Sequence, residues 1–384
     1  MKKPIYKKSP IGSLESLSAM LGINKSQLDH IISSIPNSYK SFEIETGKKL
    51  KLRQLHEPKK GLKSLQKKLN KEIFENIEYP YYLHGGIKNR DYLSNAKIHS
   101  GSKSLISLDI EDFYPNIRKT DVLNIFKNLM RFPTNVSEAL TKLVTLNGEV
   151  PQGSCCSSYI ANLIFFNSEY NIVTKIENKG FRYTRLLDDI TISSDRELTN
   201  DEKTFIISSV RSMIKSHRLN INENKTKIES SSNLNDGFEV TGLWAKHKVP
   251  KVRKNHRDHI RHLVFICKKQ AEYDKESPEY HTLWNKASGK VAQLTRLNHA
   301  ESKSLRITLN SILPEYNEDK IKKITKIADN LIKEKDKVTS NDLINKINKI
   351  LYELSIVSRT RKSLAYRYRK KINSCFSSVL KVGI

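Results

Sequence analysis

The chain lacks the long apolar runs that secretion or membrane insertion requires. No segment reaches the roughly 18 apolar residues of a membrane span, and the lysine-bearing stretch Met1–Met20 has no apolar core of a signal peptide. We therefore expect a cytoplasmic protein with no membrane partner.

Cysteine is also scarce and badly spaced for metal binding. The four cysteines, Cys155, Cys156, Cys267 and Cys375, form no C-x-x-C pair, and two adjacent cysteines make a poor zinc clamp. Reduced core thiols are expected, with neither a zinc site nor a disulfide.

Acidic residues are heavily outnumbered. The 384 residues contain 41 Asp and Glu against 68 Lys and Arg, which gives a formal charge of +27. This excess favours a polyanionic partner such as RNA or DNA, although ribosomal and membrane-surface proteins are basic too. Since 37% of the residues are hydrophobic, the chain can still build an ordinary globular core.

What the chain does contain is a set of short strand-like runs next to acids. Leu105–Ile110 is an apolar run that includes Asp109, which predicts a buried strand ending in carboxylates. Phe181–Leu187 and Ile190–Ser193 are separated only by Asp188-Asp189, which predicts a tight hairpin with both acids at its tip.

Most of the remaining chain has helical patterns. Residues 1 to about 80 are predicted to be mainly helix, with Ser13 and Ser26 as caps. Further helices are expected at Lys59–Lys71, after the turn Pro151–Gly153 with Ser154 near the cap, at Glu202–Ser216, and throughout the basic region beyond Gly242.

The segment Arg359–Lys371 mixes Tyr366 and Tyr368 with seven basic residues. This composition suits phosphate contacts and base stacking. It equally suits a solvated helix that docks through its tyrosines, so both interpretations stay open.

The acids predict a chemistry. Adding a nucleotide to a primer needs an activated oxygen nucleophile and neutralisation of the triphosphate, and two Mg²⁺ ions held by carboxylates from separate strands provide both. Asp109 and the pair Asp188-Asp189 fit this demand, although an isolated Asp-Asp is more often an exposed turn.

Five segments, in order, resemble the motifs of bacterial reverse transcriptases. They are Ser107–Ile117 (SLDIEDFYPNI), Pro151–Ser154 (PQGS), Arg182–Ser193 (RYTRLLDDITIS), Leu219–Thr226 (LNINENKT) and Val240–Leu243 (VTGL). The resemblance covers roughly residues 53 to 265 and implies an RNA-directed DNA polymerase that uses two Mg²⁺ ions. Two positions depart from the family: Leu186-Leu187 replaces Tyr-Ala, and Ser157-Ser158 replaces Ser-Pro. Neither change removes an acid, but Leu186 puts primer positioning and fidelity in question.

The resemblance implies roles for single residues. Asp109, Asp188 and Asp189 would hold the metal ions, with the carbonyl of Ile110 as a further oxygen ligand. Lys225 would protonate or steady the departing pyrophosphate.

On the nucleotide side, the resemblance places Tyr114 beneath the incoming sugar, where its bulk would exclude a 2′-hydroxyl. A core aromatic is the alternative for this position. Gln152 would line the nucleotide pocket, and Arg53 would contact the triphosphate.

Within the family, Asn95–His99 (NAKIH) resembles the Asn-Ala-x-x-His signature of retron reverse transcriptases, and Val240-Thr241-Gly242 resembles their second hallmark. Asn95, His99, Val240, Thr241 and Gly242 would then bind the RNA or primer. The implied function is to copy a cognate structured noncoding RNA into branched RNA-linked DNA (msDNA) from deoxynucleotides, with an effector protein, in antiphage defence.

Two other interpretations remain. A different bacterial defence or group II intron-like reverse transcriptase would share the motifs without both hallmarks, and a noncatalytic RNA-binding scaffold would not need the acids. No maturase, endonuclease or integrase-like extension is evident, which weakens the intron version.

The expected fold class is α+β, a right-hand polymerase with fingers, a palm made of an antiparallel sheet plus helices, and a helical thumb. The expected limits are 1–100 for the N-terminal helices and fingers, 101–240 for the palm with a fingers insertion near 119–149, and 241–384 for the basic thumb and C-terminal extension.

Overall fold

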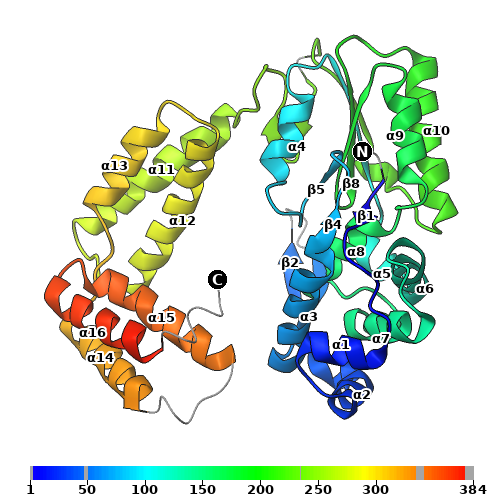
Figure 1. Cartoon of the computed structure of the whole chain (residues 1–384). Coiled ribbons are helices and arrows are strands. Elements are labelled where there is room, and N and C mark those ends of the chain that lie inside the picture. The colour runs from blue at the N-terminus through cyan, green and yellow to red at the C-terminus, as the bar shows by residue number, and fades with distance from the viewer. Residues whose placement is uncertain (1–2, 47–50, 234, 334–340, 377–384) are drawn as a thin grey trace. The chain divides into compact units, whose positions relative to one another are not determined.

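The computed structural model describes residues 3–46, 51–233, 235–333 and 341–376 (Figure 1). By their internal contacts the residues divide into two compact units, Met1–Lys251 and Val252–Ile384. The predicted boundary at 240/241 lies shortly before this division, and the limits of fingers, palm and thumb stay predictions. Across the described ranges, no helix is both long and apolar enough to cross a membrane.

A five-stranded sheet forms the centre of the first unit, with the order β5-β7-β8-β6-β9. Its strands are β5 (Leu83–His84), β6 (Ser104–Asp109), β7 (Arg182–Leu186), β8 (Asp189–Ser194) and β9 (Lys227–Ser230). All neighbours are antiparallel except β5 and β7. The apolar residues of β6 are buried, as expected for the central run of a covered sheet.

The acidic hairpin differs by one residue from its prediction. Leu186 pairs with Asp189, so the two-residue loop is Leu187-Asp188 and Asp189 already belongs to β8. Asp189 also pairs with Asp109 on β6. The prediction was displaced because Leu187 adopts a positive φ of 58° and serves as the first loop residue, a conformation that apolar patterning does not reveal.

Helices cover both sides of this sheet (Figure 1). On one side lies α4 (Tyr92–His99), and on the other lie α9 (Glu169–Glu177) and α10 (Asn200–Ser216). The expected single helix after the Pro151–Gly153 turn is two helices, α8 (Ser157–Leu163) and α9, because the chain turns between them.

The other elements of this unit complete its core or its edges. They are α1 (Leu14–Leu21), α2 (Lys25–Ser33), α3 (Lys60–Glu72), α5 (Phe113–Asn116), α6 (Lys119–Asn124), the π-helix η3 (Ile125–Leu129), α7 (Thr134–Val144), the 3-10 turns η1 (Ile35–Ser38), η2 (Phe74–Asn76) and η4 (Glu223–Lys225), and the paired strands β1 (Ile5–Tyr6) with β4 (Ile77–Glu78), β2 (Tyr39–Thr46) with β3 (Lys51–Pro58), and β10 (Glu239–Val240) with β11 (Leu243–Trp244). One apolar core runs from Leu17 to Ile221.

The predicted helical N-terminal region is only partly correct. Ser13 caps α1 as predicted, but Asn24 and not Ser26 caps α2. The long β2-β3 hairpin was missed, because it leaves Phe42, Ile44 and Leu52 exposed and so has no buried face to mark its strands. α3 follows its prediction and buries Leu62, Leu65 and Leu69.

The second unit is wholly helical in its described residues. Its helices are α11 (Lys254–Ala271), α12 (Pro278–Arg296), α13 (Ser302–Ser311), α14 (Glu318–Lys333), α15 (Asn341–Val357) and α16 (Lys362–Cys375). The last three share a core of their own. In α16, Tyr368 is buried and donates to Asp329 at 2.9 Å, whereas Tyr366 is 68% exposed, so docking and surface roles belong to different tyrosines.

Candidate catalytic cleft

A cleft of about 1170 Å³ opens in the first unit between the β2-β3 hairpin and the acid end of the central sheet. Seven of the residues singled out by the sequence line it, from five separate parts of the chain. They are Arg53, Asp109, Ile110, Tyr114, Gln152, Asp188 and Lys225. Asp189 is not among the lining residues but is the direct strand partner of Asp109.

The acids reach this cleft from two adjacent strands. Asp109 ends β6, and Asp188 occupies the turn between β7 and β8. The backbone N–H of Ile110 donates to the carbonyl oxygen of Asp188 at 3.1 Å, so the two acid-bearing segments are joined by a hydrogen bond at the cleft itself. The backbones that carry the two carboxylates are therefore held at a fixed separation.

The electrostatics show a surplus of negative charge. Loss of hydration raises the pKa of Asp188 above its ordinary value, and the nearby Asp109 raises it further. The pKa of Asp189 is raised to about 6, chiefly by partial loss of hydration and also by Asp188 and Asp109. Both shifts disfavour the ionised carboxylates, first through lost hydration and second through the neighbouring acids.

Lys225 supplies part of that charge. Its ammonium lies 2.9 Å from both carboxylate oxygens of Asp109. Lys225 comes from η4, just before β9, whose pairing with β6 brings it beside Asp109. The lysine and the acid therefore form a bidentate ion pair at the cleft.

The residues present fit divalent cations in chemistry. Three carboxylates and a backbone carbonyl are hard oxygen donors, which magnesium prefers. In the described ranges, however, no three His, Cys, Asp or Glu side chains already converge as a metal-binding group. In this structure Asp109 is paired with Lys225.

The loop that carries Gln152 is joined to the β2-β3 hairpin. The backbone N–H of His56 donates to the carbonyl of Gln152 at 2.8 Å, and Gly153 follows with φ 109°. A Cβ at Gly153 would lie 3.2 Å from the His56 carbonyl oxygen, so this close approach requires glycine. This contact brings Gln152 close to the strand that carries Arg53.

Gln66 also organises this loop and was missed by the sequence. It is fully buried on α3, donates to Tyr39 and to the carbonyl of Leu143, and accepts from Ser154 Oγ at 2.9 Å and Cys155 N at 3.3 Å. A signal existed, since Gln66 interrupts the apolar face of its helix. A polar residue on a buried face needs hydrogen-bond partners, and Ser154 and Cys155 in the loop after Gln152 are two of them.

Tyr114 lies near Asp188 in the cleft. It is partly buried and packs on the main core, so it has features of both interpretations, a cleft residue and a core aromatic. Burial raises its pKa to about 12, and Asp188 contributes to the rise. Its ring is tilted against Phe113 at a centroid distance of 5.9 Å.

The two retron-like hallmarks lie outside the cleft lining, but the loop of the second contacts the helix that carries the first. Thr241 Oγ1 donates to the carbonyl of Tyr92 in α4 at 3.0 Å. Thr241 and Gly242 form the two-residue loop of β10-β11, with φ of 49° and 79°. Positive φ at both loop positions is the type I′ pattern, which matches the twist of paired strands and favours glycine. Val240 is buried beside this loop.

His99 has no surface available for direct RNA contact. It is fully buried, its Nδ1 lies 2.8 Å from Ser193 Oγ, and its Nε2 lies 2.7 Å from Thr184 Oγ1. Burial lowers its pKa to about 3. Both ring nitrogens bind the β7-β8 hairpin, so a role of His99 in RNA binding stays a prediction.

Asn95 is also fully buried, one turn before His99 on α4. Neither its amide nitrogen nor its amide oxygen has a hydrogen-bond partner in the structure. An RNA contact by Asn95 stays a prediction and would require α4 to open.

Comparison with known proteins identifies relatives along most of the chain. The family described as reverse transcriptase (RNA-dependent DNA polymerase) matches residues 45–269. The Retron Se72 reverse transcriptase of Salmonella heidelberg is 53% identical over 97% of this chain and 98% of its own length. The Retron Ec48 reverse transcriptase of Escherichia coli is 34% identical over 81% of this chain and 79% of its own.

A third relative, the Retron Ec86 reverse transcriptase of Escherichia coli, is 27% identical over 69% of this chain and 81% of its own. Among solved structures, a Candida albicans telomerase in complex with a telomeric RNA fragment overlaps 90% of this chain and 68% of its own, at 11% identity and a TM-score of 0.36. That structural similarity is too low to support an inference, so the family assignment rests on the sequence matches.

Proposed function

Because the chain belongs to the retron reverse transcriptases and is an RNA-directed DNA polymerase with their right-hand α+β fold, we propose that it copies a cognate structured noncoding RNA into branched RNA-linked single-stranded DNA. The observation that carries the proposal is the gathering of seven predicted residues in one cleft beside the acid pair. Antiphage defence with an effector protein is part of the proposal, as is a cytoplasmic location.

The metal site in this proposal consists of Asp109, Asp188, Asp189 and the carbonyl of Ile110. Two Mg²⁺ ions bound there would activate the primer oxygen and neutralise the triphosphate. The raised pKa of Asp188 and Asp189 supports this assignment, because bound cations would relieve the crowding of negative charge.

Lys225 changes partner in this scheme. In the structure its ammonium neutralises Asp109, which keeps the side chain at the cleft before substrate arrives. If Asp109 paired with metal ions instead, the Lys225 ammonium would be free to steady or protonate the departing pyrophosphate.

Nucleotide selection would come from the opposite wall. Arg53 would pair with the triphosphate and Gln152 would line the base and sugar pocket of the deoxynucleotide. Tyr114 would stand where a ribose 2′-hydroxyl must fit. We expect Tyr114→Val to raise ribonucleotide incorporation relative to deoxynucleotide, measured by competing the two substrates on one primer, and unchanged discrimination would assign Tyr114 to the core alone.

RNA recognition would involve the β10-β11 hairpin, which carries Val240–Gly242, and the many basic residues of the chain. A formal charge of +27 favours contacts with phosphates, and structured RNA is recognised largely by shape and 2′-hydroxyl contacts. Affinity for the cognate RNA should therefore fall steeply with salt.

The product tests the proposal. The protein is expressed with its native flanking locus, and its bound nucleic acid is digested with ribonuclease. A discrete short DNA should remain with a ribonucleotide joined by a 2′,5′ bond, and a debranching enzyme should change its mobility. Linear complementary DNA, long repeats or untemplated polymer would instead indicate another bacterial defence or intron-like reverse transcriptase.

A further inference from the structure

Arg185 is a fully buried charged residue beside the catalytic turn. It lies on β7, three residues before Asp188, and its side chain is 0% exposed. Its partner Glu169 on α9 is 3% exposed. Buried charges persist only when they are paired and hydrogen-bonded, so the contacts of this pair show what it holds.

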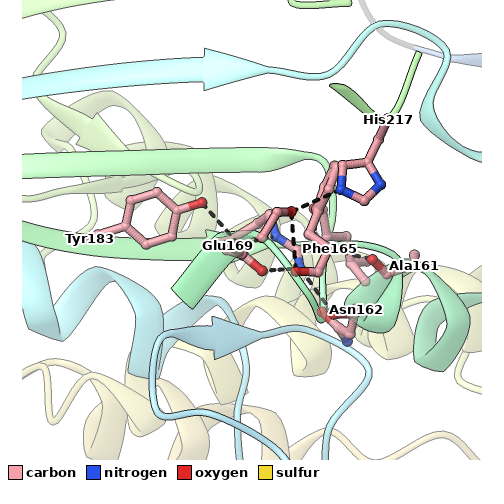
Figure 2. Close-up of polar contacts among 9 residues, drawn as sticks. Ala161, Asn162, Phe165, Glu169, Tyr183 and His217 are labelled. Carbon is pink, nitrogen blue, oxygen red and sulfur yellow. Dashed lines mark hydrogen bonds and ion pairs between the residues drawn. The ribbon is translucent and has the colours of Figure 1, made fainter. Parts of the chain in front are cut away.

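The guanidinium uses all five of its N–H donors. Two go to the carboxylate of Glu169, at 2.6 and 2.8 Å. Two go to the carbonyls of Ala161 and Asn162 near the end of α8, at 3.1 and 3.0 Å, and one goes to the carbonyl of Leu187 at 3.0 Å. Figure 2 shows Glu169 beside Ala161 and Asn162 in this network.

The contact with Leu187 matters because Leu187 is strained. Its φ of 58° is a conformation that a non-glycine residue rarely adopts. Arg185 binds the Leu187 carbonyl, and the N–H of Ile110 binds the Asp188 carbonyl at 3.1 Å. The two peptide groups that flank Asp188 are therefore held from outside the loop.

Glu169 itself has a second hydrogen-bond partner. The hydroxyl of Tyr183 donates to its Oε1 at 2.9 Å, as Figure 2 shows. The Arg185 guanidinium also lies 5.1 Å from the ring centroid of Phe165, which stacks with Phe113 at 6.2 Å. The network thus joins the acid turn to the residue next to Tyr114.

We propose that Arg185, oriented by Glu169, is a positioning residue that fixes the Leu187-Asp188 backbone so that the carboxylates of Asp188 and Asp189 face the cations at the right spacing. This inference rests on the proposed metal site. The competing explanation is that the buried pair only stabilises the core, and the two differ in what happens to cation binding when the fold is intact.

The first test is Arg185→Lys, which keeps a positive charge near Glu169 but has three donors in place of five. Binding of Mn²⁺ to the protein–RNA complex is measured by the loss of the free-ion paramagnetic resonance signal. We expect weakening of about tenfold or more, as for other partners that orient metal ligands. Circular dichroism and RNA affinity should stay unchanged.

Arg182→Lys is the matched control. Arg182 lies on the same strand and binds Asp195 and Ser193 at the end of the hairpin away from Asp188, so its replacement should not change Mn²⁺ binding. Equal Mn²⁺ affinities for wild type and Arg185→Lys would overturn the inference.

Leu187→Gly in the Arg185→Lys background separates positioning from core stability. Glycine adopts a positive φ without strain, so the turn would need less external support and Mn²⁺ binding should partly recover. If the pair only stabilises the core, Mn²⁺ binding should not recover. Failure of Mn²⁺ binding to recover would therefore contradict the positioning role. If Arg185→Lys does not fold, the uncharged double variant Arg185→Gln with Glu169→Gln replaces it and should give the same loss and recovery.

Asp188→Asn with Asp189→Asn is the reference. If this variant still binds Mn²⁺ like wild type, the metal site itself is wrong, and the proposed function fails together with this inference. If it loses Mn²⁺ while Arg185→Lys does not, only the positioning role fails.

Discussion

Two hairpins with two-residue loops carry two of the five motifs of this protein, and they are held in different ways. The β7-β8 loop has a leucine at positive φ and lies within the five-stranded sheet, where His99 contacts both strands and Arg185 binds the loop carbonyl. The β10-β11 loop has Thr241 and Gly242 at positive φ in a separate two-stranded sheet.

The comparison shows what stabilises the backbone conformation of each loop. The hallmark loop uses glycine, so its second position is encoded locally. The β7-β8 loop has no glycine, and the side chain that binds it, Arg185, is held by Glu169 and α8, which come from another part of the sequence. Changes should therefore act locally in one hairpin and through tertiary contacts in the other.

The largest effect should come from the acids of the catalytic loop. Asp188→Asn with Asp189→Asn should abolish DNA synthesis, because the carboxylate charge needed for the cations is lost. RNA binding should remain, since the basic surface is unchanged. Primer extension and a filter-binding assay measure the two, and normal extension would disprove the catalytic role of this hairpin.

The next effect concerns the support behind the hairpin. His99→Leu leaves the hydroxyls of Thr184 and Ser193 without their histidine partner and should lower the free energy of unfolding by about 2 kcal/mol at pH 7.5. Denaturant unfolding measures this. The exposed His30→Leu is the control and should leave stability unchanged.

This stability difference should depend on pH. The pKa of His99 is lowered to about 3 in the folded protein, against an ordinary value of 6.5. Below pH 6.5 His99 binds a proton in the unfolded chain but not in the folded chain. The free energy of unfolding of wild type therefore falls by about 2 kcal/mol between pH 6.5 and 5. The gap between wild type and His99→Leu should close over that range, and a constant gap would mean that His99 is protonated when folded.

A smaller effect is expected in the hallmark loop. Gly242 has φ 79°, and a Cβ there would meet no atom within 4 Å, so Gly242→Ala adds only backbone strain of about 1 kcal/mol. The self-primed product should decrease more than extension of a supplied primer, measured on one gel. Equal losses would place this hairpin in general catalysis.

The smallest effect is expected at Leu186. It packs beside Gly85, whose Cβ would lie 3.1 Å from the Leu186 Cγ, and it ligates no ion in the proposed site. Leu186→Tyr should leave the enzyme active and alter mainly primer handling or misincorporation, measured by mismatch extension. Complete inactivity would show that this pocket has adapted to leucine.

Much of the framework follows from local sequence. The apolar run before Asp109 predicted β6, the two runs around the acids predicted the hairpin, and the leucines of α3 predicted its buried face. These patterns are readable because burial of one face or of a whole strand leaves a periodic trace. The motifs themselves indicated the reverse transcriptase family.

What remained for the tertiary structure was which distant residues support that framework. Nothing near His99 in the sequence says that it binds the β7-β8 hairpin, and nothing near Arg185 says that its guanidinium binds Glu169 and the end of α8. Nor does it say that Lys225 pairs with Asp109 across 116 positions, or that the catalytic loop begins at Leu187. The sequence by itself determined the elements and the family because those depend on local periodicity and motif order. Only the tertiary structure decided the partners of the buried charges, because a hydrogen bond depends on where chains meet in space.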